Sequence, residues 1–123
     1  MTLPIITDPK PTVTWTDPTT DINGAPLQAG EITGYNIGIR DLAAAGSVAG
    51  TYPNTAAVTG ASTSSEALAL LFQSGAMIAG HSYAVAGQTL APTPPGPSAW
   101  STEFQFTFQP LVAPNPPAGF SVS

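Results

Sequence analysis

The stretch Tyr35-Asn36-Ile37-Gly38-Ile39-Arg40 most constrains the fold of this chain, because large apolar residues alternate in it with polar or small ones. Successive side chains of a β-strand point to opposite faces of the sheet, so a period of two places Tyr35, Ile37 and Ile39 on one face. Asn36, Gly38 and Arg40 share the other face. The pattern over residues 32–40 therefore predicts a β-strand with one buried face.

Similar patterns predict further strands along the chain. In the strand expected at 12–16, Val13 and Trp15 face one way and threonines the other. Residues 66–72 contain good helix formers, but the segment is short and its context favours a strand. The other strands are expected at an edge over 3–8, as one or two short strands within 48–58, at 82–90 and at 99–108. Several short strands separated by turn signals indicate an all-β sandwich or barrel.

The composition suits either a component of an assembly or a secreted β domain. The 123 residues have room for one domain with one core. Only 7% of the residues are charged, against about 25% in most soluble domains. With so few charges, neighbouring copies repel one another only weakly, which suits an assembled protein. A surface covered by neutral polar groups is equally typical of secreted β domains, so composition leaves both open.

Charge and cysteine content exclude several classes of protein. Lys10 and Arg40 face seven acidic residues, for a net charge of −5, whereas a nucleic-acid binder needs several cations to neutralise phosphates. Anionic membranes are disfavoured as partners for the same reason. The absence of cysteine excludes disulfides and thiolate metal sites. No apolar run approaches the roughly 20 residues that span a bilayer. The start has no signal-peptide pattern, so we expect synthesis in the cytoplasm if Met1 is the natural start.

Four short motifs, taken together, resemble the fibronectin type III family. They are Thr14-Trp15-Thr16-Asp17-Pro18, Ile32-Thr33-Gly34-Tyr35-Asn36-Ile37, Ile78-Ala79-Gly80-His81-Ser82-Tyr83 and Gly96-Pro97-Ser98. The resemblance covers roughly residues 4 to 108. It implies a seven-stranded fibronectin type III (immunoglobulin-like) β-sandwich. The core residues that it implies, together with the strand patterns, are Trp15, Tyr35, Ile37, Tyr83 and Val85.

The resemblance also implies one hydrogen bond and shows two departures. Tyr83 lies where the family has a tyrosine corner, so its hydroxyl is expected to bond a backbone group a few residues upstream. Ala79 stands where the family commonly has proline. The stretch Phe72–Ile78 is longer than is usual in the family, which leaves the end of the strand before it open.

The sequence divides into a sandwich over residues 1–108 and a proline-rich arm over residues 109–123. Four prolines in the arm favour an extended chain, up to about 45 Å long as polyproline II. Its last part, with Pro116, Pro117, Phe120 and Val122, resembles the first strand of another fibronectin type III module. Such a strand is a candidate to pair with the sheet edge of a neighbour. The alternative is a frayed terminus or a linker from a tandem array.

The sequence predicts no catalytic residue. His81 is the single histidine, and its neighbour Ser82 points to the opposite face of the expected strand, so no triad is indicated. Nothing in the pattern brings the acids Glu31, Glu66 and Glu103 together as a pair for glycoside hydrolysis. We expect His81 to be a loop residue before a strand, and the protein not to be an enzyme.

No metal or cofactor site is predicted either. Asp17, Asp21 and Asn23 offer oxygen ligands, but their spacing does not match a calcium loop, and Asp and Asn are common turn residues. The stripe Trp100, Phe104, Phe106 and Phe108 is expected to face the core. The alternative use of that stripe is an aromatic surface that stacks on sugar rings.

The leading functional hypothesis is a bacteriophage virion structural protein, because small free-standing members of the family without signals resemble proteins that decorate capsids, tails or fibres. Its expected partners are copies of itself or other virion proteins, with host surface glycans as further candidates. The expected location is the virion, after synthesis in the host cytoplasm. The candidate distal binding loops are neighbours at one end of such a sandwich: Asp21, Asn23 and Gly24 in one, Pro94, Pro95 and Gly96 in the other. The alternative is an extracellular carbohydrate-associated or spacer module of a secreted bacterial enzyme or adhesin.

Overall fold

The computed structural model describes residues 2–28, 30–60, 65–67 and 77–123, with the backbone alone for 65–67. Within these residues the chain is built from strands and turns, which confirms the all-β prediction. None of the described residues forms a helix long and apolar enough to cross a bilayer. The strands are β1 (Ile5–Ile6), β2 (Thr12–Thr14), β3 (Gly34–Asp41), β4 (Asn54–Thr59), β5 (Ser65–Ala67), β6 (Ser82–Leu90) and β7 (Phe104–Phe108).

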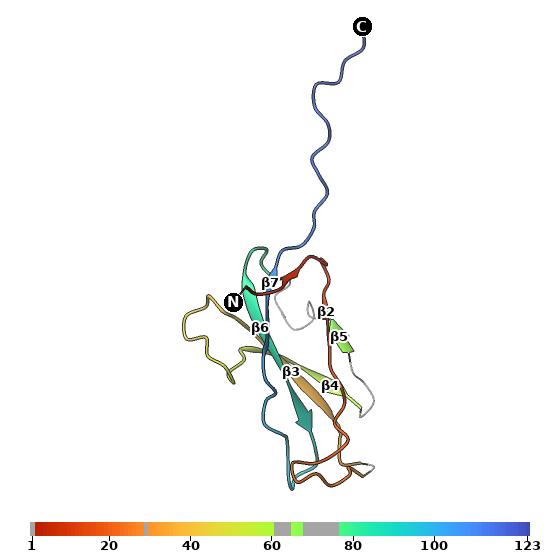
Figure 1. The fold of residues 1–123 in the computed structure, drawn as a ribbon, viewed down its shortest axis with the longest axis vertical. Coiled ribbons are helices and arrows are strands. Elements are labelled where there is room, and N and C mark those ends of the chain that lie inside the picture. Colours follow the sequence, from red (N-terminus) through yellow and green to blue (C-terminus); the bar gives the residue numbers. More distant parts are fainter. Residues whose placement is uncertain (1, 29, 61–64, 68–76) are drawn as a thin grey trace.

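Five of these strands form one mixed sheet in the order β1-β7-β6-β3-β4, and β2 pairs antiparallel with β5 in a separate sheet (Figure 1). In the large sheet β3 is paired along its whole length with β6, from Gly34 opposite Leu90 to Asp41 opposite Tyr83. The β1 strand runs parallel to β7 at the sheet edge. Prolines at positions 9 and 11 follow β1 and lack a backbone N–H. The chain leaves the large sheet there and continues into β2.

The hydrophobic core lies on the face of the large sheet that β2 covers. Val13 and Trp15, from and just after β2, pack against the core cluster and are themselves partly buried. The predicted core residues Tyr35, Ile37, Tyr83 and Val85 are all buried. Trp15, which is only partly buried, lies at the edge of the core, whereas the sequence predicted it to be a core residue. The buried members of the cluster are Tyr35, Ile37, Ile39, Val58, Met77, Tyr83, Val85, Phe106 and Phe108.

The outer face of the large sheet is also covered, which the alternating pattern did not predict. Arg40 on β3, Ala84 and Ala86 are buried although their neighbours in the strands fill the inner core. Tyr52 lies across Gly38, where an added Cβ would come within 2.6 Å of the Tyr52 ring. Glycine at this position therefore lets an aromatic side chain lie flat on the sheet. The central strands are buried on both faces because a side-chain layer covers the outer face.

Several strand boundaries differ from the prediction. The strand expected over 12–16 ends at Thr14, and the strand expected over 99–108 begins at Phe104. Between Ser98 and Ser101 the chain still bonds to β6, but irregularly, through Ser98 N–H to the Thr89 carbonyl (2.9 Å) and Ser101 N–H to the Gly87 carbonyl (2.8 Å). Serine side chains there also accept bonds from β6 amides and so interrupt a regular ladder.

Other predicted strands agree in place. The segment 48–58 supplies one strand, β4, and 82–90 matches β6. The strand predicted over 66–72 corresponds to β5 at its first residues, and its remaining residues, 68–72, lie outside the described part of the chain. Most of the unusually long Phe72–Ile78 stretch also lies outside it.

The hydrogen bond implied for Tyr83 is present. Its hydroxyl accepts a bond from the backbone N–H of Ile78 at 2.8 Å, five residues upstream. Burial is the main cause that raises the Tyr83 pKa above its usual value, with the Ile78 bond acting in the opposite direction. The bond fixes the segment that leads into β6.

We expect Tyr83→Phe to lower the free energy of unfolding by about 1 kcal/mol, because the Ile78 N–H loses its acceptor. Urea unfolding followed by tryptophan fluorescence measures this change. The denaturant dependence should stay unchanged, since the same surface is exposed on unfolding. An unshifted midpoint would show that the bond does not contribute.

Candidate interaction site

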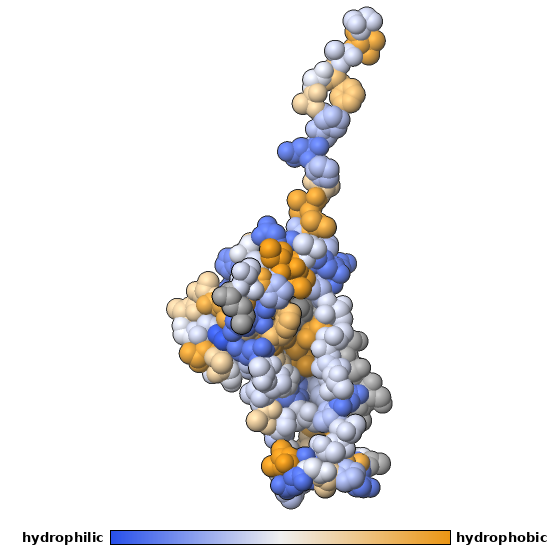
Figure 2. All heavy atoms as spheres, in the orientation of Figure 1, coloured by the Kyte–Doolittle hydropathy of each residue, from blue (hydrophilic) through white to orange (hydrophobic). Residues whose placement is uncertain are grey.

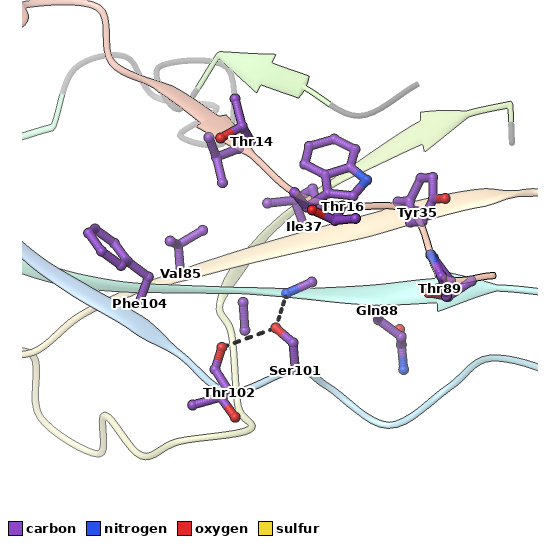
Figure 3. Close-up of a pocket in the computed structure, with 15 residues that line it drawn as sticks. Thr14, Thr16, Tyr35, Ile37, Val85, Gln88, Thr89, Ser101, Thr102 and Phe104 are labelled. Carbon is purple, nitrogen blue, oxygen red and sulfur yellow. Dashed lines mark hydrogen bonds between the residues drawn. The ribbon is translucent and has the colours of Figure 1, made fainter. Parts of the chain in front are cut away.

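The clearest concave site is a groove between β2 and the segment that leads into β7. We call it the β2 groove; its volume is about 210 Å³, and its walls are residues 13–16 with Pro18 on one side and 101, 102 and 104 on the other. Figure 3 shows Ile37 and Val85 between these two walls. The described residues that line it include no charged side chain. Such a groove favours neutral, apolar occupants over ionic ones.

Trp15 gives the groove one polar group without a partner. Its ring lies 5.3 Å from that of Tyr35, centroid to centroid, and its Nε1 is buried with no hydrogen-bond acceptor among the described residues. Buried indole N–H groups usually find an acceptor. Burial and a hydrogen bond to the Asp17 carboxylate raise the pKa of Tyr35 to about 12. The Tyr35 hydroxyl therefore stays protonated in ordinary buffers. Trp15 Nε1 is therefore enclosed by the described residues, while the Tyr35 hydroxyl remains a hydrogen-bond donor to Asp17.

Phe104 lies at the other wall and corrects the sequence prediction for its stripe. Phe106 and Phe108 are buried as expected, but Phe104 is 54% exposed. Its ring stacks at 6.1 Å on that of Phe106. Trp100 lies outside β7 and packs against Tyr52 at 4.6 Å instead of continuing the inward stripe. Trp100 leaves the stripe because residues 98–103 run irregularly before β7. Phe104 keeps the face of Phe106 and is exposed because it lines the open β2 groove.

The arm, residues 109–123, projects from the body as an extended chain without secondary structure (Figure 1). Its root is held along β1 by two hydrogen bonds, Gln109 N–H to the Ile6 carbonyl and Leu111 N–H to the Thr7 carbonyl, both 2.9 Å. Beyond the root, apolar surface appears along the arm (Figure 2). The exposed fractions of its large apolar side chains are 73% for Leu111, 84% for Val112, 83% for Phe120 and 100% for Val122.

The two loops proposed for binding lie at the opposite end of the body from the arm (Figure 1). The end of the loop before β3 lies beside the start of the loop after β6, because Thr33 N–H donates to the Leu90 carbonyl at 2.9 Å. In the first loop the Asp21 carboxylate accepts bonds from the N–H groups of Asn23 and Ala25, and Gly24 takes a φ of +85° that favours glycine. In the second, Gly96 N–H bonds the Pro92 carbonyl.

These contacts support the turn interpretation of Asp21, Asn23 and Gly24. The Asp21 carboxylate is used to close its own loop, which is an ordinary role of Asp in turns. A group of three or more side chains placed to hold a metal ion is not found in the described part of the chain. The residues Pro94, Pro95 and Gly96 likewise form a turn, and Pro94 and Pro95 are exposed.

The strongest polar cluster is on the outer face of the large sheet, and the sequence did not predict it. Arg40 Nε and Nη2 donate to the two carboxylate oxygens of Glu103, each at 2.7 Å, and both side chains are about nine-tenths buried. Arg40 also donates to Ser47, and the Tyr52 hydroxyl donates to Glu103 at 2.8 Å. The position of Arg40 on the polar side of a predicted strand was the one feature of the sequence that could have indicated this cluster. No feature near Arg40 in the sequence identifies Glu103 as its partner.

The Arg40 hydrogen bonds lower the pKa of Glu103 from 4.5 to about 2. A carboxylate whose pKa is depressed on folding stabilises the protein above its ordinary pKa, and this contribution is lost as the pH falls toward 2. We expect the difference in melting temperature between the unmodified protein and Glu103→Gln to narrow steadily from pH 5 to pH 2.5. Thermal unfolding by circular dichroism measures it. A constant difference across this range would contradict the assignment.

The other candidate chemical residues are not brought together. His81 Nδ1 lies 2.7 Å from Asp41 Oδ2, while Ser82 Oγ bonds Thr107 Oγ1, so the serine has a different partner from the histidine. His81 precedes β6, as the sequence predicted. Glu31 is exposed and bonds the Gln28 N–H, Glu103 pairs with Arg40, and the Glu66 side chain lies outside the described residues.

Comparison of the chain with protein-family models, with curated proteins and with solved structures finds no match.

Proposed function

We propose that this protein is a non-enzymatic structural component that assembles through its arm and its sheet edges, with a fibronectin type III-like sandwich as its body. The observation that carries the proposal is the arm, which takes four large apolar side chains away from the body and into solvent. Exposed apolar segments of this kind mark interaction sites. The low charge of the chain is consistent with close packing of many copies.

Two observations support the proposed body. The β2–β5 pair packs Val13 against a core built on the five-stranded sheet, as a two-layered sandwich requires. The bond between Tyr83 and Ile78 has the form of a tyrosine corner. The fibronectin type III assignment itself rests on the sequence motifs.

The more specific proposal is a virion decoration protein. The arm and the two turn loops lie at opposite ends of the body, so a copy attached by its arm presents those loops outward (Figure 1). Loops with exposed Pro94 and Pro95 are then placed to contact host surface glycans. Many copies turn weak single contacts into firm attachment. The other candidate, a spacer module of a secreted protein, uses the arm as a linker.

The test compares the 123-residue chain with a version that ends at Val112 and so keeps the root along β1. Light scattering and negative-stain imaging give the size and shape of each. A third version, Phe120→Ser with Val122→Ser, keeps the length of the arm and removes the two large apolar side chains near its end. We expect the full chain to assemble and both altered versions to remain monomers. Three indistinguishable monomers would overturn the proposal and favour the spacer module.

A further inference from the structure

We propose that the β2 groove receives the arm of a second copy, whose residues 118–123 add a strand beside β2 and place the Phe120 ring in the groove. This inference rests on the proposed function and names the surface that receives the arm. Four observations carry it: an edge of β2 that pairs with no other described strand, a groove of suitable size, an arm of matching character and a root that directs the arm away from its own body.

The receiving edge is provided by β2. Among the described residues β2 pairs with β5 alone, while β1, the preceding strand, pairs with β7 in the large sheet. In an antiparallel pair every second residue directs both of its backbone groups away from its partner. A two-stranded sheet is marginal by itself, and a third strand with an apolar face stabilises it. An extended peptide beside β2 would supply that strand.

The groove suits one aromatic side chain. Its volume of about 210 Å³ exceeds the roughly 150 Å³ of an apolar cavity that accepts benzene. Phe104 at one wall is 54% exposed and offers an apolar surface to an entering ring.

The arm matches the groove in charge and in pattern. Residues 109–123 contain no charged side chain, and neither do the described residues that line the groove. In an extended strand Phe120 and Val122 point to the same face, and Ser121 and Ser123 point to the other. The first pair is 83% and 100% exposed on the isolated chain. Docking would bury the apolar pair and leave the serines toward solvent.

A second copy is the occupant because the arm is directed away from its own groove. The bonds of Gln109 and Leu111 to residues 6 and 7 hold the root in line with β7. Beyond the root, prolines at 114, 116 and 117 fix their own φ and disfavour helical turns in the residues before them. Residues 112–117 therefore continue outward, as Figure 1 shows. A return to the same body would require a reversal within this stiff segment.

The experiment uses cysteine cross-linking in the full chain, which has no cysteine of its own. One variant carries Thr102→Cys at the wall of the groove, and a set of second variants carries one cysteine at a position from 118 to 123. Each pair is mixed under mild oxidation, and disulfide-linked dimers are followed by gel electrophoresis. The matched control replaces Thr102→Cys with Asn23→Cys, an exposed position in the loop before β3. Circular dichroism confirms that every variant is folded.

We expect at least one arm position to link to Thr102→Cys about tenfold or more faster than to the control, because docking raises the local concentration of the two thiols. Adding Phe120→Ser to the arm variant should abolish the difference. Equal rates with both partners would overturn the proposal. A chain that carries both cysteines and forms only an intramolecular disulfide would also overturn the proposal, because the arm would then occupy the groove of its own body.

These outcomes separate the receiving surface from the assembly itself. If light scattering shows assembly that depends on Phe120 and Val122 but Thr102→Cys does not link, the β2 groove is the wrong receptor and the proposed function stands. If the full chain is monomeric at all concentrations, both proposals fail.

Discussion

Replacing Phe106 with alanine is expected to lower the free energy of unfolding by about 3 to 5 kcal/mol, the usual range for a large aromatic residue removed from a core. Phe106 is 1% exposed and lies at the centre of β7, where it contacts Tyr83 and Phe104 through ring pairs 6.0 and 6.1 Å apart. The strand cannot close over the resulting cavity, because β6 and β1 hold β7 on both sides. Urea unfolding measures the loss.

Phe104→Ala is the matched control for this experiment. It removes the same side chain from the same strand two residues away, at a position that is 54% exposed. We expect its cost to be less than half that of Phe106→Ala, since less apolar area returns to water and no closed cavity forms. Similar costs for the two variants would contradict the placement of Phe104 at an open groove.

Glu103→Gln is expected to lower the free energy of unfolding by about 3 kcal/mol, the lower end of the range for breaking a buried ion pair. The carboxylate accepts from both Arg40 Nε and Arg40 Nη2. A glutamine amide offers one oxygen and turns an NH₂ donor toward the second Arg40 donor. The Arg40 charge then stays buried without a counterion. Chemical unfolding at pH 7 gives the value.

Two controls separate the ion pair from the loss of one negative charge. Glu31→Gln makes the same change at an exposed position and should alter stability by less than about 0.5 kcal/mol. The double change Arg40→Met with Glu103→Leu removes both charges and should recover most of the loss, since apolar replacements of buried pairs are often close to neutral. A double variant as unstable as Glu103→Gln would point to Ser47 and Tyr52 as the main contributors.

The inner half of the fold could be predicted because it depends on a local pattern. Strict alternation over residues 35–40 identifies the inward face of β3, and the same reasoning places Tyr83 and Val85. Phe106 and Phe108 follow the same rule. Each of these residues is buried by a strand whose two faces have different polarity, so a period of two in the sequence is enough.

The outer layer and the groove could not be predicted because both depend on long-range contacts. Arg40 and Glu103 are 63 positions apart and meet through the pairing of β3, β6 and β7. Phe104 has the parity of a core residue but is exposed, because it lines the open β2 groove. Trp15 follows β2 by one residue and lies at the open side of the core. The alternation of apolar and polar residues along a strand does not indicate which neighbouring strand will pair with each of its edges.

The most direct test of an arm that docks on a neighbour is amide hydrogen exchange of the full chain, measured at several protein concentrations. We expect the amides of residues 118–123 and of the β2 segment, residues 12–16, to become protected together as the concentration rises. Both should lose this added protection in the chain with Phe120→Ser and Val122→Ser. If the arm amides exchange at the unprotected rate at every concentration, the arm does not dock on a second copy, contrary to both proposals.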